Sequence, residues 1–79
     1  MSTLPAIIEM LMHRGWLRPG DDAQSQFDEI GMEAEELDQF IGEVERRFGV
    51  TLPEDDVESI CTVEDLATAV DGQINQGSE

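Results

Sequence analysis

Six carboxylates lie close together in the sequence between positions 28 and 38, and carboxylate oxygens are ligands that divalent cations accept. They are Asp28, Glu29, Glu33, Glu35, Glu36 and Asp38. The stretch lacks the ligand spacing and the turn glycine of a calcium-binding loop. We therefore interpret it as the solvated start of an acidic helix, and we expect no dedicated metal site there.

Two other side chains have the chemistry for catalysis, His13 and Cys61. His13 follows an apolar stripe and has no serine or cysteine partner in a recognisable arrangement, which favours a helix-end residue over a general base. Cys61 lies between Ile60 and Thr62, which favours a partly buried side chain over a nucleophile. Because Cys61 is the only cysteine in the sequence, an intramolecular disulfide and a cysteine-based metal cluster are excluded. We expect that the chain is not an enzyme.

The overall charge limits which partners the chain can bind. Nineteen acidic residues face four basic ones, all arginine, which gives a formal net charge of -15. Nucleic acid is excluded, because phosphate binding needs clustered lysine and arginine, and an anionic membrane surface is disfavoured for the same reason. Proteins with basic patches fit, since they are attracted over a long range. The alternative is that the charge only keeps a small domain soluble.

The length and the apolar pattern indicate one small domain. Seventy-nine residues can bury a single thin core. No apolar run approaches the length that spans a bilayer, and the first residues lack the basic region of a signal peptide. We expect a cytoplasmic monomer.

The spacing of apolar residues predicts four helices and no strand of useful length. They cover roughly 4–13, 33–48, 55–60 and, after Thr62, the segment up to about residue 71. The helix stripes are Leu4, Ile7, Ile8, Leu11 and Met12, then Leu37, Phe40, Ile41, Val44 and Phe48, and finally Val63, Leu66, Ala67, Val70 and Ile74. The long connection over 15–32 contains Trp16, Leu17, Phe27 and Ile30. Because these side chains are too apolar for a free linker, we expect them to pin the loop to the bundle.

Local signals predict how the helices begin and approach one another. Thr3 or Ser2 is expected to cap the first helix. Thr62 and Asp65 have the spacing of a capping box at the last one. Gly42, inside the second helix, is expected to let a neighbouring helix come close.

Three segments resemble consecutive motifs of the acyl carrier proteins. FDEIG at 27–31 resembles the F-x-D-L-G loop before their second helix. EVERRFGVTLPEDDV at 43–57 resembles the end of that helix and the I-P-x-x-D link that follows. ICTVEDLATAV at 60–70 resembles their fourth helix, I-x-T-V-x-D-L-x-x-x-V. The segments keep the family's order and spacing, while the first helix carries no specific motif.

The resemblance implies an all-α four-helix bundle with a long loop between helices one and two and a short helix three. In that family a serine in a D-S-L motif opens helix two and carries a phosphopantetheine arm, whose thiol holds acyl or aminoacyl groups. Acidic residues of helix two meet basic patches on partner enzymes. We expect one carrier-like domain over residues 1–79, with a frayed tail over 72–79.

The attachment motif departs from the family's pattern. Aligned without gaps, D-S-L falls on Glu33, Ala34 and Glu35, so the hydroxyl that forms the phosphodiester is missing. A register shifted by two residues puts the attachment position at Glu36 and recovers Leu37, but it rotates the rest of the helix by about 200°. Neither register contains a serine. We therefore expect no phosphopantetheine on this sequence.

The first functional hypothesis is a carrier-like interaction module that has lost the arm. Its expected partner contacts are Met32, Glu33, Glu35, Glu36, Asp38, Gln39 and Glu43. The second is a genuine carrier of fatty-acid, polyketide or related biosynthesis with serine changed to alanine at Ala34. Because Glu35 and Asp38 also depart from the family, natural divergence is favoured over one engineered change. A third hypothesis is a small acidic regulator of a basic protein, with an incidental match to the fold.

Overall fold

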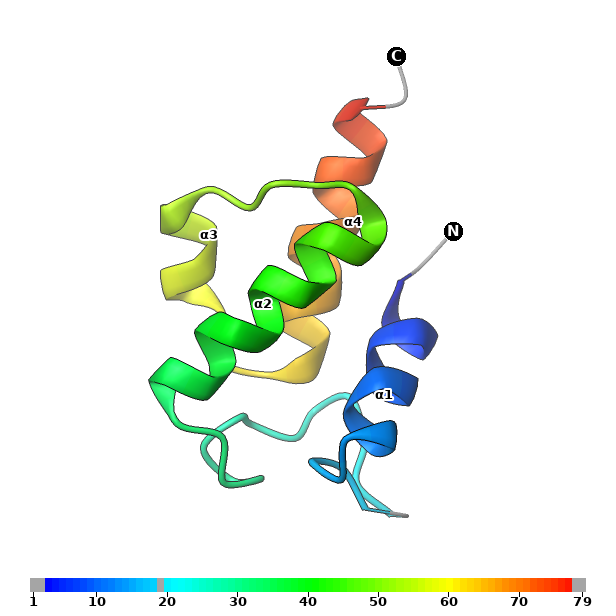
Figure 1. Ribbon diagram of the computed structural model, residues 1–79, viewed down its shortest axis with the longest axis vertical. Coiled ribbons are helices and arrows are strands. Elements are labelled where there is room, and N and C mark those ends of the chain that lie inside the picture. The colour runs from blue at the N-terminus through cyan, green and yellow to red at the C-terminus, as the bar shows by residue number, and fades with distance from the viewer. Residues whose placement is uncertain (1–2, 19, 78–79) are drawn as a thin grey trace.

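The computed structural model describes residues 3–18 and 20–77, with side chains up to residue 74. It contains four helices, α1 (Leu4–His13), α2 (Ala34–Phe48), α3 (Glu54–Ser59) and α4 (Val63–Gly77), and no strand within these residues. Figure 1 shows α2 crossing in front of α4, with α3 on one side and α1 on the other. The expected small all-α bundle with a short third helix is confirmed.

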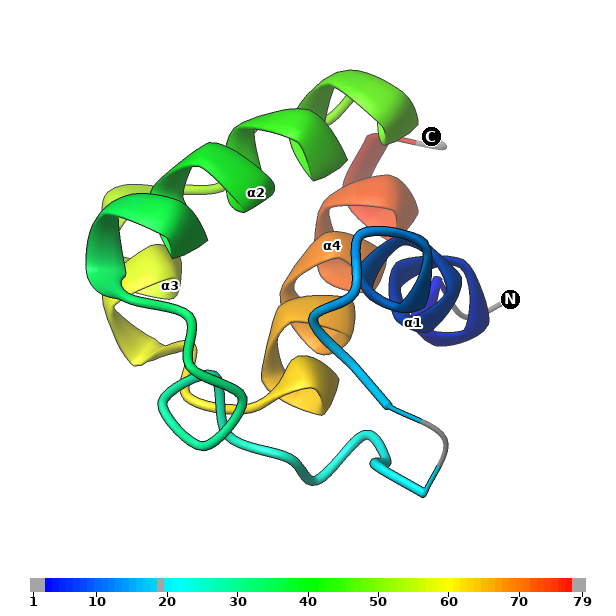
Figure 2. The ribbon, with the colours of Figure 1, turned by 60° about the horizontal axis from the view of Figure 1, so that its bottom comes forward.

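Helix α4 is the centre of the bundle, since each of the other three helices packs against it. Figure 2 shows α1 running beside α4, with α2 and α3 on the opposite side. The stripe predicted for this helix explains its place: Val63, Leu66 and Val70 are fully buried. Ile74 continues the same stripe but is 36% exposed, because it lies beyond the packed part of the helix.

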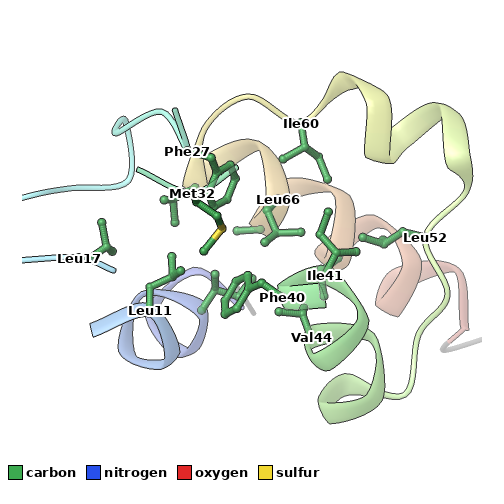
Figure 3. Packing of buried hydrophobic residues seen from close by; sticks show 14 residues of the cluster. Leu11, Leu17, Phe27, Met32, Phe40, Ile41, Val44, Leu52, Ile60 and Leu66 are labelled. Atoms are coloured by element: carbon green, nitrogen blue, oxygen red, sulfur yellow. The ribbon is translucent and has the colours of Figure 1, made fainter. Parts of the chain in front are cut away.

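The long connection between α1 and α2 contributes side chains to the core. Leu17, Phe27 and Met32 are buried, and Trp16 and Ile30 pack against the same cluster. Figure 3 shows Met32 beside Phe27, pointing into the cluster. The expectation that apolar side chains pin this loop to the bundle is confirmed.

The backbone of the same loop also holds the first turn of α4. The N–H of Val63 donates to the carbonyl of Ser25 at 3.2 Å, and the N–H of Glu64 donates to the carbonyl of Ala23 at 2.9 Å. The first N–H groups of a helix have no partner inside it. The loop therefore supplies acceptors that α4 lacks. We call this set of bonds the loop clasp.

The side-chain caps agree with the sequence at α4 and differ at α1. The Thr62 hydroxyl accepts from the N–H of Asp65 at 3.1 Å, and the Asp65 carboxylate accepts from the N–H of Thr62 at 3.1 Å. At α1 the Thr3 side chain makes no cap. Instead, the N–H of Thr3 donates to the Asp71 carboxylate at 2.8 Å, so α4 provides the acceptor. Ser2 lies outside the described residues.

Four helix bounds, in three helices, differ from the prediction. Helix α2 begins at Ala34 with Glu33 as its N-cap, and α3 begins and ends one residue earlier than expected. Helix α4 continues through Gly72 to Gly77, beyond the end predicted near residue 71. Each residue added to a helix gains one backbone hydrogen bond, which can offset the cost of a glycine. Residues 78–79 lie outside the described part.

The expectation for Gly42 is wrong. A methyl group built on its Cα would meet no atom within 4 Å apart from its chain neighbours and the backbone of its own helix. No neighbouring helix therefore approaches closely enough to require a glycine here. Gly42 therefore lowers the stability of α2 without a packing reason inside the molecule.

We predict that Gly42→Ala raises the free energy of unfolding by about 1 kcal/mol, because alanine costs less backbone entropy in a helix. For a domain of this size, the melting temperature should rise by about 4–8 °C. Urea and thermal unfolding followed by circular dichroism measure both. Gly49→Ala is the control: Gly49 has φ +67° at the C-cap of α2, so alanine there should destabilise the fold. Equal effects at both positions would contradict the argument.

Candidate functional site at the start of helix two

The corner where α2 begins is held by backbone contacts. Gly31 turns the chain with φ +84°, a value that favours glycine. The N–H of Met32 then donates to the carbonyl of Phe27 at 3.0 Å. Glu33 caps the helix in an extended conformation, and its N–H donates to the carboxylate of Glu36 at 3.3 Å. These contacts place the methyl group of Ala34 in solvent at the first helical position.

A hollow of about 190 Å³ lies beside Ala34, between the long loop and the segment that joins α3 to α4. Its lining residues are Gln26, Phe27, Asp28, Met32, Ala34, Leu37, Ile60 and Cys61. The floor is apolar, because Phe27, Met32 and Ile60 belong to the core. The N–H of Phe27 donates to the carbonyl of Cys61 at 3.0 Å and ties two walls together. No residue of the lining carries a hydroxyl.

An acidic face follows on the outer side of α2. Glu35, Asp38 and Gln39 are exposed, and their spacing of three and four residues puts them on one side of the helix. With the exposed Glu33 and the half-buried Glu36, they form the set that we call the acidic face. Because Glu36 also receives the helix-start hydrogen bond, Glu35 and Asp38 have the carboxylates most available for a partner.

Two of the expected partner contacts are engaged inside the molecule. Met32 is only 2% exposed and packs in the core, so it is not part of the outer surface of α2. Glu43 forms an ion pair with Arg14, which joins α2 to the end of α1. We therefore leave both residues out of the acidic face.

The other reactive side chains are placed as follows. His13 is exposed at the last position of α1, and Cys61 is exposed rather than partly buried as expected. Cys61 precedes α4 and lines the hollow beside Ala34. Among the described residues, no three His, Cys, Asp or Glu side chains are grouped so that they could hold a metal ion.

A cluster of arginines was not anticipated from the sequence. Arg14, Arg46 and Arg47 border one open groove together with Met10 and Glu43. They lie at the C-terminal ends of α1 and α2, where the helix dipole favours positive charge. The pair at 46–47 could be read from the sequence as a helix end, but its proximity to Arg14 depends on how the two helices pack.

The geometry can be compared with that of known proteins. A family model described as the phosphopantetheine attachment site matches residues 12–70. The chain belongs to this family. The match covers the corner at Ala34, the acidic face and the first half of α4, and it confirms the resemblance found in the sequence.

The fold of this carrier-family chain is similar to that of the acyl carrier protein from Thermotoga maritima. The TM-score is 0.81 over 95% of this chain and 89% of the other, with 17% sequence identity. At this identity the likeness concerns the fold alone. No curated protein matches the sequence. Within the described residues, no helix is long and apolar enough to cross a membrane.

The residues at the corner do not fit the attachment of a phosphopantetheine arm. Such an arm needs an oxygen nucleophile at the start of α2, and Ala34 supplies only a methyl group. The alternative position, Glu36, lies two residues into the helix and takes part in its cap.

We predict that a phosphopantetheinyl transferase of broad specificity, supplied with coenzyme A, adds no mass to this protein. Intact-protein mass spectrometry gives the readout. Ala34→Ser combined with Glu35→Leu brings the corner closer to the family's D-S-L pattern and should gain mass, whereas Ala34→Ser alone should gain less because Glu35 stays charged. A mass gain on the unchanged sequence would refute the assignment of the corner.

We also predict how cations act on the acidic surface. A net charge of -15 causes self-repulsion that any salt screens. Sodium chloride and magnesium chloride at matched ionic strength should therefore raise the melting temperature by equal amounts. A clearly larger rise with magnesium would indicate a specific site and would contradict the interpretation of these carboxylates as a solvated surface.

Proposed function

We propose that this protein is a carrier-family domain that works without an arm and binds partner proteins through the acidic face of α2. The observation that carries the proposal is the exposed methyl group of Ala34 at the first position of α2, to which our motif alignment assigns the family's reactive serine. The fold that presents this corner is kept, and the group that the corner would present is absent. A protein-binding role depends only on the fold and on the acidic face of α2, and it requires no catalytic residue.

The neighbours of Ala34 support natural divergence over a single change of serine. Glu35 replaces an apolar residue beside the attachment position, and Asp38 replaces another on the same helix. Both side chains are exposed, so their charges are compatible with the fold. A serine changed to alanine only to prevent attachment of the phosphopantetheine arm would not require the charges of Glu35 and Asp38.

The chemistry of the acidic face selects basic partners. Glu35 and Asp38 add their negative charges to a chain whose total is -15. Such a field speeds encounters with positive surfaces and repels negative ones, and its effect weakens as salt rises. Membership of the carrier family supports biosynthetic enzymes with basic patches as the class of partner. We include a cytoplasmic, monomeric state in the proposal.

A genuine acyl or aminoacyl carrier is the second candidate. The family match favours it, since the matched family is described by its attachment site. The coding triplet for position 34 in the source organism separates the two: a serine codon supports the carrier, and an alanine codon supports the proposal. The third hypothesis, with an incidental fold match, loses its premise because the chain belongs to the family.

We predict that reversing the charges of Glu35 and Asp38 removes the binding of partners. Immobilised wild-type protein should retain a set of basic proteins at low salt, and Glu35→Lys with Asp38→Lys should lose that set. The matched control is Glu9→Lys with Glu58→Lys, which changes the net charge equally from exposed positions on α1 and α3. It should retain the set, because the total charge alone does not define the surface.

Quantitative mass spectrometry of the retained proteins compares the variants. Partners retained equally by both double variants would remove the acidic face from the proposal. Circular dichroism of each variant shows whether a loss of binding reflects a loss of fold.

A further inference from the structure

The hollow beside Ala34 has the size and the chemistry of a side-chain pocket. Its volume of about 190 Å³ falls below the roughly 300–1,000 Å³ of sites that bury a drug-sized ligand. A single aliphatic or aromatic side chain is an occupant of suitable size.

The lining divides into an apolar floor and a polar mouth. Phe27, Met32 and Ile60 reach the hollow from the core, and Leu37 is half-buried beside them. A side chain that enters would therefore exchange water for apolar contacts. Ala34 borders the hollow with the smallest side chain that carries a Cβ, so it leaves the mouth open.

The surroundings of the mouth are negatively charged. Asp28 is part of the lining, and the exposed carboxylates of Glu33 and Glu35 flank Ala34 in the sequence. A partner whose apolar side chain enters here must bring its neighbouring residues close to these charges. Lysine or arginine at those neighbouring positions is attracted, whereas glutamate or aspartate is repelled.

From these observations we infer that the hollow receives one apolar side chain of a partner segment in which that side chain is flanked by lysine or arginine. The inference rests on the proposed function and adds to it a central contact. Protein interfaces commonly depend on one buried anchor within a ring of weaker polar contacts. Here the acidic face would supply that ring, and the hollow would receive the anchor.

The larger hollow between α3 and α4 fits this role less well. Its volume is about 350 Å³, and polar or small side chains such as Ser59, Thr68 and Gly72 form most of its lining. Of its lining residues, only Ile60 belongs to the buried cluster. An apolar anchor would find less apolar surface to cover there.

Two short synthetic peptides test the inference without knowledge of the natural partner. The first is Lys-Arg-Leu-Arg-Lys, capped at both ends, and the second has glycine in place of leucine. Titration into isotope-labelled protein at low salt, followed by amide chemical shifts, gives both the affinity and the place of binding. We expect the leucine peptide to bind at least about fivefold more tightly. It should shift the amides of Ala34, Leu37 and Cys61.

Two substitutions at one position provide the control. Ala34→Leu narrows the hollow and should reduce the affinity ratio of the two peptides to about one, while Ala34→Ser leaves the hollow open and should keep the ratio. Both preserve the net charge, and Ala34 is exposed, so both should fold. Thermal unfolding confirms that they do.

Each outcome bears on the inference. Equal binding of the two peptides to the wild-type protein would overturn it and leave the acidic face intact as a binding surface. A preference for leucine that persists in Ala34→Leu would place the apolar contact elsewhere and also overturn it. If neither peptide binds, the proposed function fails together with the inference.

Discussion

The first turn of α4 has N–H groups that need acceptors, and the loop clasp provides them from residues far earlier in the chain. Because the carbonyls of Ser25 and Ala23 accept hydrogen bonds from this turn, the segment that follows them is fixed against α4. Phe27 and Met32 then enter the core, and Gly31 turns the chain into α2. The corner at Ala34 and the hollow beside it are therefore consequences of how α4 begins. A loop held only by its own turns would fix the position of neither the corner nor the hollow.

Charge and packing divide α2 between two sides. Phe40, Ile41 and Val44 fill the core, so the charged residues must occupy the outer surface. The acidic side chains gather at the N-terminal end, and Arg46 and Arg47 lie at the other, which is the order that the helix dipole favours. The same arrangement that stabilises the helix therefore exposes a strongly negative end beside the hollow. Stability and partner choice are not competing demands at this end of α2.

Most of the fold could be predicted because its elements follow local rules. The stripe of α4 and the capping box at Thr62 are visible in short stretches of sequence. The hydrogen bond at the start of α1 could not be predicted, because the N–H of Thr3 donates to Asp71, near the opposite end of the chain. The hollow was not predictable either, since Phe27, Ala34 and Ile60 meet only when loop and helices pack. Gly42 misled the prediction because a glycine suggests close packing, and the space around it is open.

The central place of α4 also bears on how the chain folds. Its most extensive neighbour is α1, so the first helix must find the last one across the whole intervening chain. Closing so long a loop has an entropic cost before any of the buried contacts form. Helical bundles whose neighbours are adjacent in sequence avoid that step and fold quickly. This bundle, although all-helical, contains one such distant pairing, because α1 packs against α4.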